Sequence, residues 1–482
     1  MSDPRPGLLG AVVFLSSAAV LVLEILAARI LAPYVGVTLQ SFTAIIGTIL
    51  AAIALGAWAG GKLADRIEPQ RLLGPVLVIG GLLSVATPAA VDFLGQWLRG
   101  GHPLVIVALA TVGFFAPAAV LSMVTPIVAK IALSSIDRTG TVVGSLSALA
   151  TIGAIFGTFA AGFFLVATFP SRPITWVVGA IAVLMGVSLS LPGARRYAVG
   201  GVVLLVLTIA ASAAVASPCR VETAYYCAHV RPDPKRPAGR SLILDTLRHG
   251  YVDLSDPSHL EIRYIRVMAR AAEALRPRIG EAVYLGGGAF TLPAHFQASQ
   301  GTRATVLELD EALVELVERE LGLRRGPWLD VRTGDGRLTM QALPSDSAEV
   351  LFGDAFGGLA VPWHLATEEF TREVRRVLRP GGFYIINVVD YPPTRFVRAE
   401  TATIARVFEH VAVVAPPALL AGQGGGNYVV VASDVPIDTA AIEARMTDGE
   451  VAVTGEAVRG FVGASPVLTD AYAPVDQLLG KR

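Results

Sequence analysis

The sequence predicts two domains of different class: an N-terminal all-α polytopic membrane domain of about seven helices, and a C-terminal α/β domain built on a mostly parallel sheet. The 482 residues exceed the usual size of a single hydrophobic core. Long charge-free apolar stretches recur before residue 218. From residue 225 onward, short apolar runs alternate with helical patterns, which is typical of a parallel α/β sheet.

The distribution of charge separates the two halves. The chain carries 39 basic and 39 acidic residues, of which residues 1–217 hold only 11 and 6. By subtraction, residues 218–482 hold 28 basic and 33 acidic side chains. This mildly acidic part argues against a nucleic-acid-binding surface, because such a surface needs clustered Lys and Arg.

The membrane domain is predicted from apolar stretches of the length that crosses a bilayer, which takes about 20 residues. A cleaved signal peptide would not account for six stretches beyond the first. The predicted spans are 7–33, 40–61, 72–91, 103–129, 139–171, 173–194 and 198–219.

Polar and small residues mark two of these spans. Glu24 and Arg29 lie inside the first, where a charge is costly. They indicate either a polar site within the bundle or a structural pair, with Arg29 alternatively snorkelling to the interface. Gly56, Gly60 and Gly61 end the second span, and small residues at this spacing let helices approach closely.

The two cysteines, Cys219 and Cys227, flank the junction between the halves. They are too few for a disulfide scaffold, and no zinc-like cluster or other metal site is expected. We interpret both as ordinary thiols. A local disulfide would require the junction to face an oxidising compartment.

The second domain is predicted to begin with a small β element that includes residues 241–245, followed by an amphipathic helix over 260–275. The remaining expected strands and helices alternate along the chain. The strands are Glu281–Leu285, 305–309, 328–333, 348–352, 383–388 and 427–433, and the helices between them are 311–320 and 367–378.

A glycine turn follows the first strand of the predicted parallel sheet. Gly286, Gly287 and Gly288 let the backbone turn tightly and approach a nucleoside without a Cβ in the way. A dinucleotide site favours a further glycine at position 291, for helix packing and pyrophosphate contact. That position is Thr291.

Acids end the next strands, at the sheet edge where open α/β sheets bind ligands. Glu308 follows Gly288 by 20 residues, an offset at which an acid holds both ribose hydroxyls. Asp335, beside Gly336, can receive an adenine amino group, and Asp354 ends the fourth strand. Together with the glycines, they predict a Rossmann-like site for a nucleoside-type co-substrate.

These motifs resemble the spermidine synthase family, in the form fused to a membrane domain. The resemblance covers most of the chain, from 241 to 479 and in two N-terminal segments. The matching segments are LILDTLRHGYVDLSDPSHLE, YLGGGAFTLP, VLELD, GDGR, GDAFGGLAVPWHL, RPGGFYIINV, GNYVVVAS and LTDAYAPVDQLL, with EILAARILAPYVG and GGKLADR before them.

The resemblance implies a class I methyltransferase/spermidine synthase fold with a small leading β element. It implies decarboxylated S-adenosylmethionine as co-substrate, with no tightly bound cofactor. The family's ribose-binding acid falls on Glu308, its adenine-binding acid on Asp335 and its catalytic proton acceptor on Asp354. A carboxylate suits that role, because the amine nucleophile has a pKa near ~10 and must lose a proton before it attacks.

The sequence departs from the family where polyamine contacts are expected. Ala289 and Phe290 replace the last two residues of a GGGDG turn, and Gly357 replaces a second aspartate. His249 lies where the family has a glutamine, and His259 lies where it has a tyrosine. Both histidines remain candidate substrate-binding residues.

Further pocket candidates are Tyr251 and Asp476, also as substrate-binding residues. Four others are more commonly solvated or structural in such a domain. They are Asp253, His364, Asp390 and Asp470.

Three functions stay open. The first is a membrane-bound aminopropyltransferase of polyamine biosynthesis, acting on putrescine or a related small amine. The second is methyl transfer from intact S-adenosylmethionine to an unknown acceptor, such as an apolar molecule that enters from the bilayer. The third is a transporter or sensor with a nucleoside-binding regulatory domain, since GGKLADR also resembles a major-facilitator loop. We expect a transmembrane domain over 1–217, a small β element with a linker helix over 218–278, and a Rossmann-like catalytic domain over 279–482. A lipid bilayer is an expected partner, and the chain is compatible with a homodimer.

Two arguments disagree about the side of the membrane that bears the catalytic domain. Supply of a cytosolic donor favours the cytoplasm, which we expect. The positive-inside rule instead places the loops after the second, fourth and sixth spans in the cytoplasm, and therefore the catalytic domain outside. The basic residues of those loops are Lys62, Arg66, Arg71, Lys130, Arg138, Arg195 and Arg196.

Overall fold

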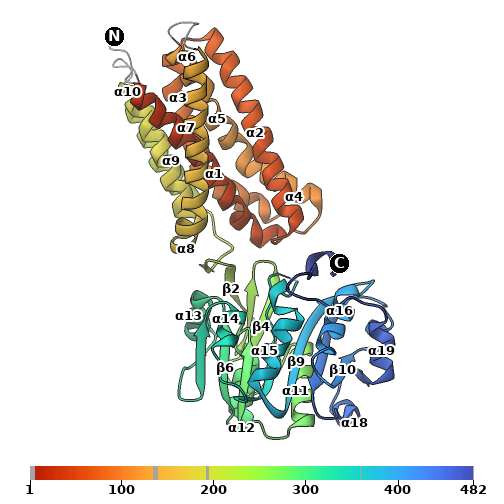
Figure 1. Cartoon of the computed structure of the whole chain (residues 1–482). Coiled ribbons are helices and arrows are strands. Elements are labelled where there is room, and N and C mark those ends of the chain that lie inside the picture. Colours follow the sequence, from red (N-terminus) through yellow and green to blue (C-terminus); the bar gives the residue numbers. More distant parts are fainter. Residues whose placement is uncertain (1–5, 134–138, 191–194, 359, 481–482) are drawn as a thin grey trace. The chain divides into compact units, whose positions relative to one another are not determined.

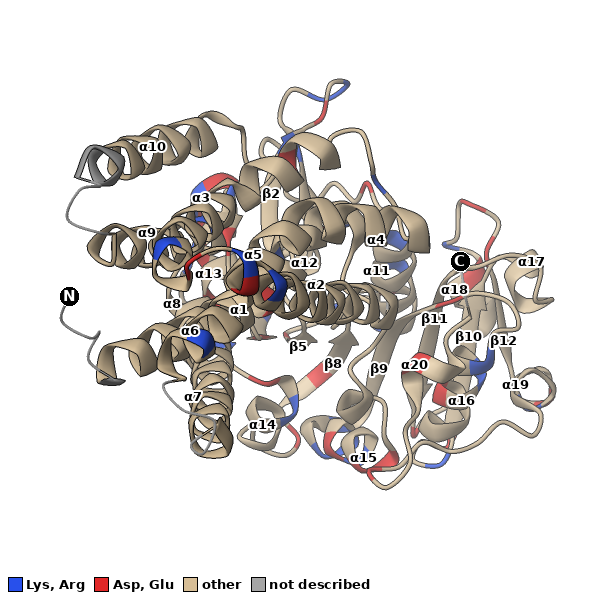
Figure 2. Ribbon diagram, turned by 90° about the horizontal axis from the view of Figure 1, so that it is seen from above, with Lys and Arg blue, Asp and Glu red and all other residues tan. Residues whose placement is uncertain are grey.

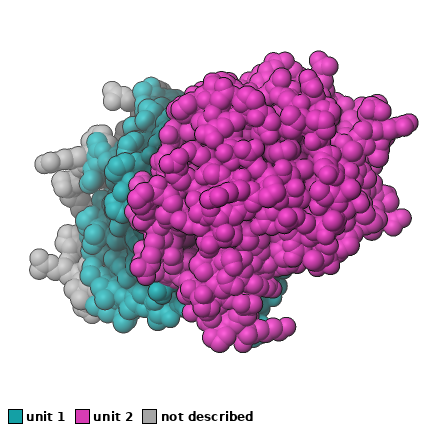
Figure 3. Space-filling model, turned by 90° about the horizontal axis from the view of Figure 1, so that it is seen from below, with its two compact units in different colours: residues 1–229, 244–246 teal, residues 230–243, 247–482 magenta. Residues whose placement is uncertain are grey.

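The computed structural model describes residues 6–133, 139–190, 195–358 and 360–480 (Figure 1). The chain divides into two compact units, coloured in Figure 3. The first comprises residues 1–229 and 244–246, and the second comprises 230–243 and 247–482.

The first unit contains a bundle of apolar helices, whose ribbons carry few charged residues (Figure 2). Six stretches of the described chain are long and apolar enough to cross a membrane, and α10 adds the shorter apolar segment Gly200–Ala214. The predicted membrane domain is consistent with this bundle. The helices are α1 (Pro6–Val35), α2 (Leu39–Arg66), α3 (Pro69–Gly95), α4 (Pro103–Ala110), η1 (Thr111–Phe115), α5 (Ala116–Ser122), α6 (Val124–Ala132), α7 (Thr139–Ala160), η3 (Ala161–Leu165), α8 (Val166–Thr168), α9 (Ser171–Ser188) and α10 (Arg195–Ala214).

The glycines of α2 allow the close helix contact that the sequence predicts. A Cβ on Gly56 would collide with the backbone of Ala119, and one on Gly60 would lie 2.7 Å from the Cα of Met123. At Gly61 a Cβ would meet only ordinary contacts. Two of the three glycines therefore set the approach of α2 to α5 and α6.

Arg29 of α1 has partners outside its own helix. The guanidinium of Arg29 lies 3.1 Å from the Glu222 carboxylate and donates to the carbonyl oxygens of Val166 and Thr223. Arg29 thus joins the bundle to the segment that follows α10. A pair between Glu24 and Arg29 stays a prediction.

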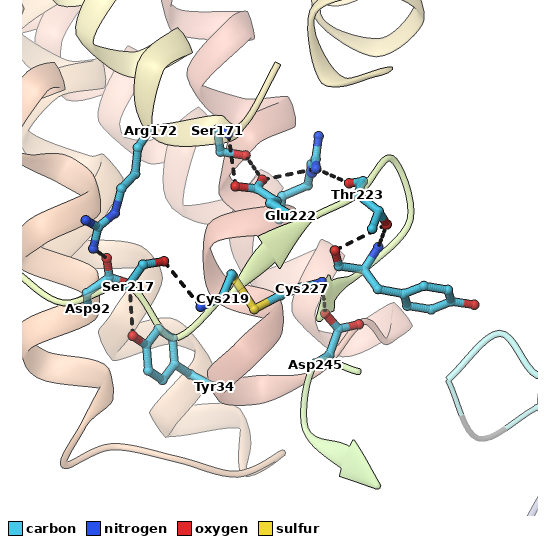
Figure 4. Close-up of a disulfide and its surroundings, with 12 residues drawn as sticks. Tyr34, Asp92, Ser171, Arg172, Ser217, Cys219, Glu222, Thr223, Cys227 and Asp245 are labelled. Atoms are coloured by element: carbon cyan, nitrogen blue, oxygen red, sulfur yellow. Dashed lines mark hydrogen bonds and ion pairs between the residues drawn. A yellow bond between two sulfur atoms is a disulfide. The ribbon is translucent and has the colours of Figure 1, made fainter. Parts of the chain in front are cut away.

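The two cysteines form a disulfide, so the interpretation of ordinary thiols is wrong (Figure 4). The reason is a local reversal of the chain that the spacing alone does not reveal. Strands β1 (Val221–Glu222) and β2 (Cys227–Pro232) pair antiparallel, with Glu222 opposite Cys227. This pairing brings the Cα atoms of Cys219 and Cys227 to 5.0 Å, a separation that a disulfide spans.

The strands form two sheets. A four-stranded sheet has the order β1-β2-β3-β4, with β3 (Gly239–Leu244) and β4 (Leu247–Asp253). An eight-stranded sheet has the order β12-β10-β11-β9-β8-β5-β6-β7. Its members are β5 (Glu281–Leu285), β6 (Arg303–Glu308), β7 (Leu329–Thr333), β8 (Ala348–Gly353), β9 (Leu378–Asp390), β10 (His410–Ala415), β11 (Gly426–Ser433) and β12 (Val451–Thr454).

Strands β5 to β9 run parallel, and β10 to β12 are antiparallel additions. The predicted α/β fold, with its small leading β element, is therefore confirmed. The parallel strands carry the carboxyl ends of β5, β6, β7 and β8 to one edge of the sheet. The glycine turn follows β5, Glu308 is the last residue of β6, and Asp335 and Asp354 come within two residues of the ends of β7 and β8.

Helices with one apolar side cover this sheet. In α15 (Glu368–Val377), Phe370, Val374 and Val377 are fully buried, while charged side chains occupy the other side. These residues pack into the main core of the unit. The remaining helices are α11 (Arg263–Leu275), α12 (Thr291–Gln300), α13 (Glu311–Glu320), α14 (Gly336–Gln341), η5 (Trp363–Leu365), α16 (Arg395–Ile404), α17 (Pro417–Leu420), α18 (Thr439–Glu443), α19 (Glu456–Val462) and α20 (Val475–Leu478).

Candidate active site

The glycine turn after β5 is held tightly against the neighbouring strand. Gly286 has φ +93° and Gly288 has φ +50°, both in the region that favours glycine. A Cβ on Gly286 would lie 2.5 Å from the carbonyl oxygen of Asp354. The first glycine is therefore required both by its backbone conformation and by the closeness of β8.

The predicted ribose acid, Glu308, lies against this turn. Its carboxylate accepts hydrogen bonds from the backbone N–H groups of Gly287 (2.8 Å), Gly288 (3.4 Å) and Asp310 (3.0 Å). Burial raises the pKa of Glu308, and these N–H groups oppose that rise. A carboxylate has about four acceptor sites, so it keeps capacity for a ligand hydroxyl.

The predicted adenine acid, Asp335, begins α14. Its Oδ1 accepts from the N–H groups of Arg337 (3.0 Å) and Leu338 (3.1 Å), which makes Asp335 the N-cap of that helix. Its Oδ2 lies 3.0 Å from Nε2 of His364. Gly336 is packed closely, since a Cβ there would lie 2.6 Å from Cδ1 of Leu285.

A cavity opens beside the glycine turn and Asp354. Its empty volume, including space open to solvent, is about 530 Å³. Among the described residues that line it, Asp354 is the only carboxylate, and there is no Lys or Arg. The walls are His249, Tyr264, Ile265, Tyr284, Gly286, Gly287, Gly288, Ala289, Thr291, Leu292, Pro293, Phe352, Asp354 and Phe356.

Asp354 is fixed at both carboxylate oxygens. Oδ2 accepts from the hydroxyl of Tyr264 at 3.0 Å, and Oδ1 accepts from Nδ2 of Asn387 at 2.9 Å. Asn387 in turn accepts from Nδ2 of Asn427 at 2.9 Å. Strand register explains the contact between Asn387 and Asp354. Gly353 pairs with Ile386, so the residues that follow them, Asp354 and Asn387, lie side by side.

Burial raises the pKa of Asp354 to about 6, while the hydrogen bonds from Asn387 and Tyr264 lower it. The carboxylate is therefore a stronger base than an exposed aspartate and is still mostly ionised at pH 7. Burial also lowers the pKa of His249 to about 4, which keeps this imidazole neutral. A neutral ring does not repel a cationic ligand in the cavity.

The structure brings together only part of the predicted site. His249, the three glycines and Asp354 line the cavity, and Glu308 touches the glycines. The other predicted substrate-binding residues do not line it. Tyr251 donates to Asp233 (2.8 Å), His259 lies 3.1 Å from Glu261, and Asp476 is exposed in α20.

Three further acids have structural partners. Asp253 binds Arg236 and Ser255, and Asp470 binds Arg337 and Thr367. Asp390 accepts from the backbone N–H groups of Tyr391, Val397 and Gly480. Within the described residues, no three His, Cys, Asp or Glu side chains gather as a metal site.

Sequence reasoning missed three polar residues of the site. Tyr264 lies on α11, and Asn387 and Asn427 lie inside β9 and β11. A signal existed for the two asparagines, because both fall within segments that resemble the family, RPGGFYIINV and GNYVVVAS. Tyr264 had no such signal, since an aromatic residue on an amphipathic helix usually belongs to the core.

The fold and the site define the class: a chain with apolar helices and an α/β unit of methyltransferase-like fold, in which the glycine turn and the Asp354 carboxylate line one cavity. No family model matches the chain. It is 25% identical over 148 residues to the polyamine aminopropyltransferase of Vibrio vulnificus, covering 30% of this chain and 48% of that protein. It is 29% identical over 127 residues to a probable polyamine aminopropyl transferase of Bifidobacterium longum, covering 25% and 26%.

The chain thus spans about half or less of the length of these curated relatives. Among solved structures, it is similar to a probable spermidine synthase from Corynebacterium glutamicum, with 27% identity and a TM-score of 0.49 over 52% of this chain and 95% of that one. It also matches human methyltransferase-like protein 13 in complex with SAH, with 16% identity and a TM-score of 0.33 over 45% and 100%. The predicted resemblance to the spermidine synthase and polyamine aminopropyltransferase family is confirmed by the curated relatives.

Proposed function

We propose that the α/β unit is a transferase that uses an adenosyl sulfonium donor, and that it moves an aminopropyl group from decarboxylated S-adenosylmethionine to putrescine or a related amine. The observation that carries this proposal is the position of Asp354, which lines the same cavity as the glycine turn. In this proposal Glu308 holds the ribose and Asp335 the adenine. The reacting carbon then lies between the turn and Asp354.

Asp354 supplies the proton acceptor that the reaction needs. The acceptor nitrogen forms a bond to the aminopropyl carbon while the carbon–sulfur bond breaks, and the electron pair of that bond neutralises the sulfonium. The nitrogen must first be neutral, which costs about 4 kcal/mol for an amine of pKa near ~10 at pH 7. A buried carboxylate whose pKa is about 6 both orients the ammonium and takes its proton.

A second candidate is methyl transfer from intact S-adenosylmethionine. The cavity favours it in one respect, because Asp354 is the only carboxylate among the described lining residues, and Phe352 and Phe356 form part of the wall. A diamine would bring a second ammonium for which these described residues offer no partner charge. Ala289 and Gly357 stand where the family has carboxylates, which agrees with this observation.

Calorimetry on the purified full-length chain tests the proposal. Under aminopropyl transfer, the decarboxylated donor binds more tightly than the intact one, and mass spectrometry detects an aminopropylated amine. Tighter binding of intact S-adenosylmethionine, with a methylated product, would favour the second candidate. Binding of either donor with no product from any amine would indicate a regulatory nucleoside site instead.

The pH dependence of turnover reports on the contact between Tyr264 and Asp354. The Tyr264 hydroxyl lowers the pKa of Asp354, so Tyr264→Phe raises it above about 6. Because the ionised carboxylate is the active form, the acid limb of the kcat profile moves to higher pH. The rate at pH 6 falls several-fold and recovers at alkaline pH.

Tyr428→Phe is the matched control. It removes a hydroxyl that donates to Leu419 at 2.9 Å, and Tyr428 does not line the cavity. Its pH profile should equal that of the native chain. If both variants keep the native acid limb, Tyr264 does not set the ionisation of Asp354.

A further inference from the structure

The segment after α10 contains a covalent cross-link that the proposed function does not use. Cys219 and Cys227 are bonded across the β1–β2 hairpin, and they are the two cysteines of the chain. Forming the bond removes two protons and two electrons from two thiols. In an oxidising compartment, the disulfide of an exchange catalyst accepts these protons and electrons. Structural disulfides in proteins are rare in the cytosol.

The hairpin is anchored at one end of the helical bundle (Figure 4). The backbone N–H of Ser171 donates to Glu222 at 3.0 Å, and Nη1 of Arg172 donates to the carbonyl of Val215 at 2.8 Å. Ser171 and Arg172 begin α9. The hairpin therefore lies at the end of the bundle where α9 starts and α10 finishes.

The opposite end of the bundle carries most of the basic loop residues. Lys62 and Arg66 end α2, Arg71 begins α3, and Lys130 ends α6, where it pairs with Asp65 at 2.8 Å. Arg195 and Arg196 begin α10, and Arg138 lies outside the described residues. The positive-inside rule assigns this end to the cytoplasm.

In the described part of the chain, the hairpin end carries fewer basic residues, which are Arg29, Arg99, Arg172 and Arg220. The guanidinium of Arg172 pairs with Asp92, which also accepts from the Tyr34 hydroxyl at 2.9 Å. Arg99 lies over the ring of Tyr34 and donates to the carbonyl of Gly95. The charge difference between the two ends and the presence of the disulfide are independent observations. Both place the hairpin end outside the cytoplasm.

We propose that the hairpin bearing the Cys219–Cys227 disulfide, and with it the α/β unit, faces the oxidising, extracytoplasmic side of the membrane. Counting α10 with the six long stretches gives an odd number of crossings. No further candidate span follows Ala214 in the described part of the chain. A donor made in the cytosol must then be carried across the membrane before the α/β unit can bind it.

Alkylation of the native chain in whole cells tests the disulfide. Cells are quenched in acid and alkylated under denaturing conditions with a maleimide that increases the mass, with and without prior reduction. We expect no modified cysteine without reductant and two with it. Modification of both cysteines without reductant would overturn the proposal.

Single-cysteine reporters test the side of the membrane. Ala298→Cys, exposed on α12, and Ile67→Cys, 45% exposed at the end of α2, are introduced separately into a Cys219→Ser/Cys227→Ser chain. Sealed right-side-out vesicles are treated with a membrane-impermeant maleimide. We expect Ala298→Cys to react at once and Ile67→Cys to react only after permeabilisation.

Failure of Ala298→Cys to react before permeabilisation would overturn the proposal, as would immediate reaction of Ile67→Cys. Should the double serine chain fail to accumulate, a phosphatase that is active only after disulfide formation can be fused to the C-terminus of the native chain. Activity of that fusion supports the proposal, and its inactivity refutes it. None of these readouts depends on donor binding or catalysis, so they are separate from the test of the proposed function.

Discussion

Asp354→Asn should reduce turnover by about 10²–10⁴-fold while leaving donor affinity unchanged, because the amide cannot accept the proton of the attacking amine. The substitution preserves shape and contacts. The amide oxygen can accept from Asn387, and the amide N–H can donate to the Tyr264 oxygen, which replaces the native hydrogen bond with one of reversed direction. Single-turnover rates and calorimetric donor affinity of the full-length chain measure the two effects.

Asp330→Asn provides the matched control for this loss. Asp330 is exposed on β7, its carboxylate pairs with the neighbouring Arg332, and it does not line the cavity. Its rate should equal that of the native chain. An Asp354→Asn chain that turns over at the native rate would show that another group accepts the proton.

Glu308→Gln is the second change with a large expected effect, and it should weaken donor binding about a hundredfold. A hydrogen bond to a charged group contributes about 1.5–3 kcal/mol, and the proposed contact involves two ribose hydroxyls. The glutamine oxygen still accepts from the N–H of Gly287, so the turn should remain folded. Calorimetry measures the dissociation constant, and thermal unfolding shows whether the fold is preserved.

Glu311→Gln removes an exposed charge from the start of α13, close in sequence to Glu308. Donor affinity should be native in this control. Equal affinity in the Glu308→Gln chain would place the ribose elsewhere. A similar loss in both variants would indicate a general charge effect rather than a direct contact.

The sequence predicted most of the fold because local patterns determine it. The strand Glu281–Leu285 and the helix Glu311–Glu320 have the predicted bounds, since each is a short apolar or amphipathic run with a clear boundary. Asp310 caps that helix, as its position before the apolar pattern suggests. The acids after the strands also follow from local order, because parallel strands bring their carboxyl ends together.

Contacts between distant segments could not be predicted in this way. Tyr264 reaches Asp354 across 90 positions of sequence, and Asn427 reaches Asn387 across 40. These pairs depend on which strands are neighbours and in what register. Cys219 and Cys227 show the same limit at short range, since their bond depends on a hairpin that has no strong turn motif.

The contact between Gly286 and the end of β8 has an evolutionary consequence. Because any side chain at Gly286 would collide with the backbone of Asp354, the position of the glycine turn and the position of the proposed proton acceptor depend on each other. Mutations that shift one must disturb the other. We expect related chains that use other acceptor substrates to differ in α11 or at the start of α12. The contact between Gly286 and the Asp354 backbone should be the same in them.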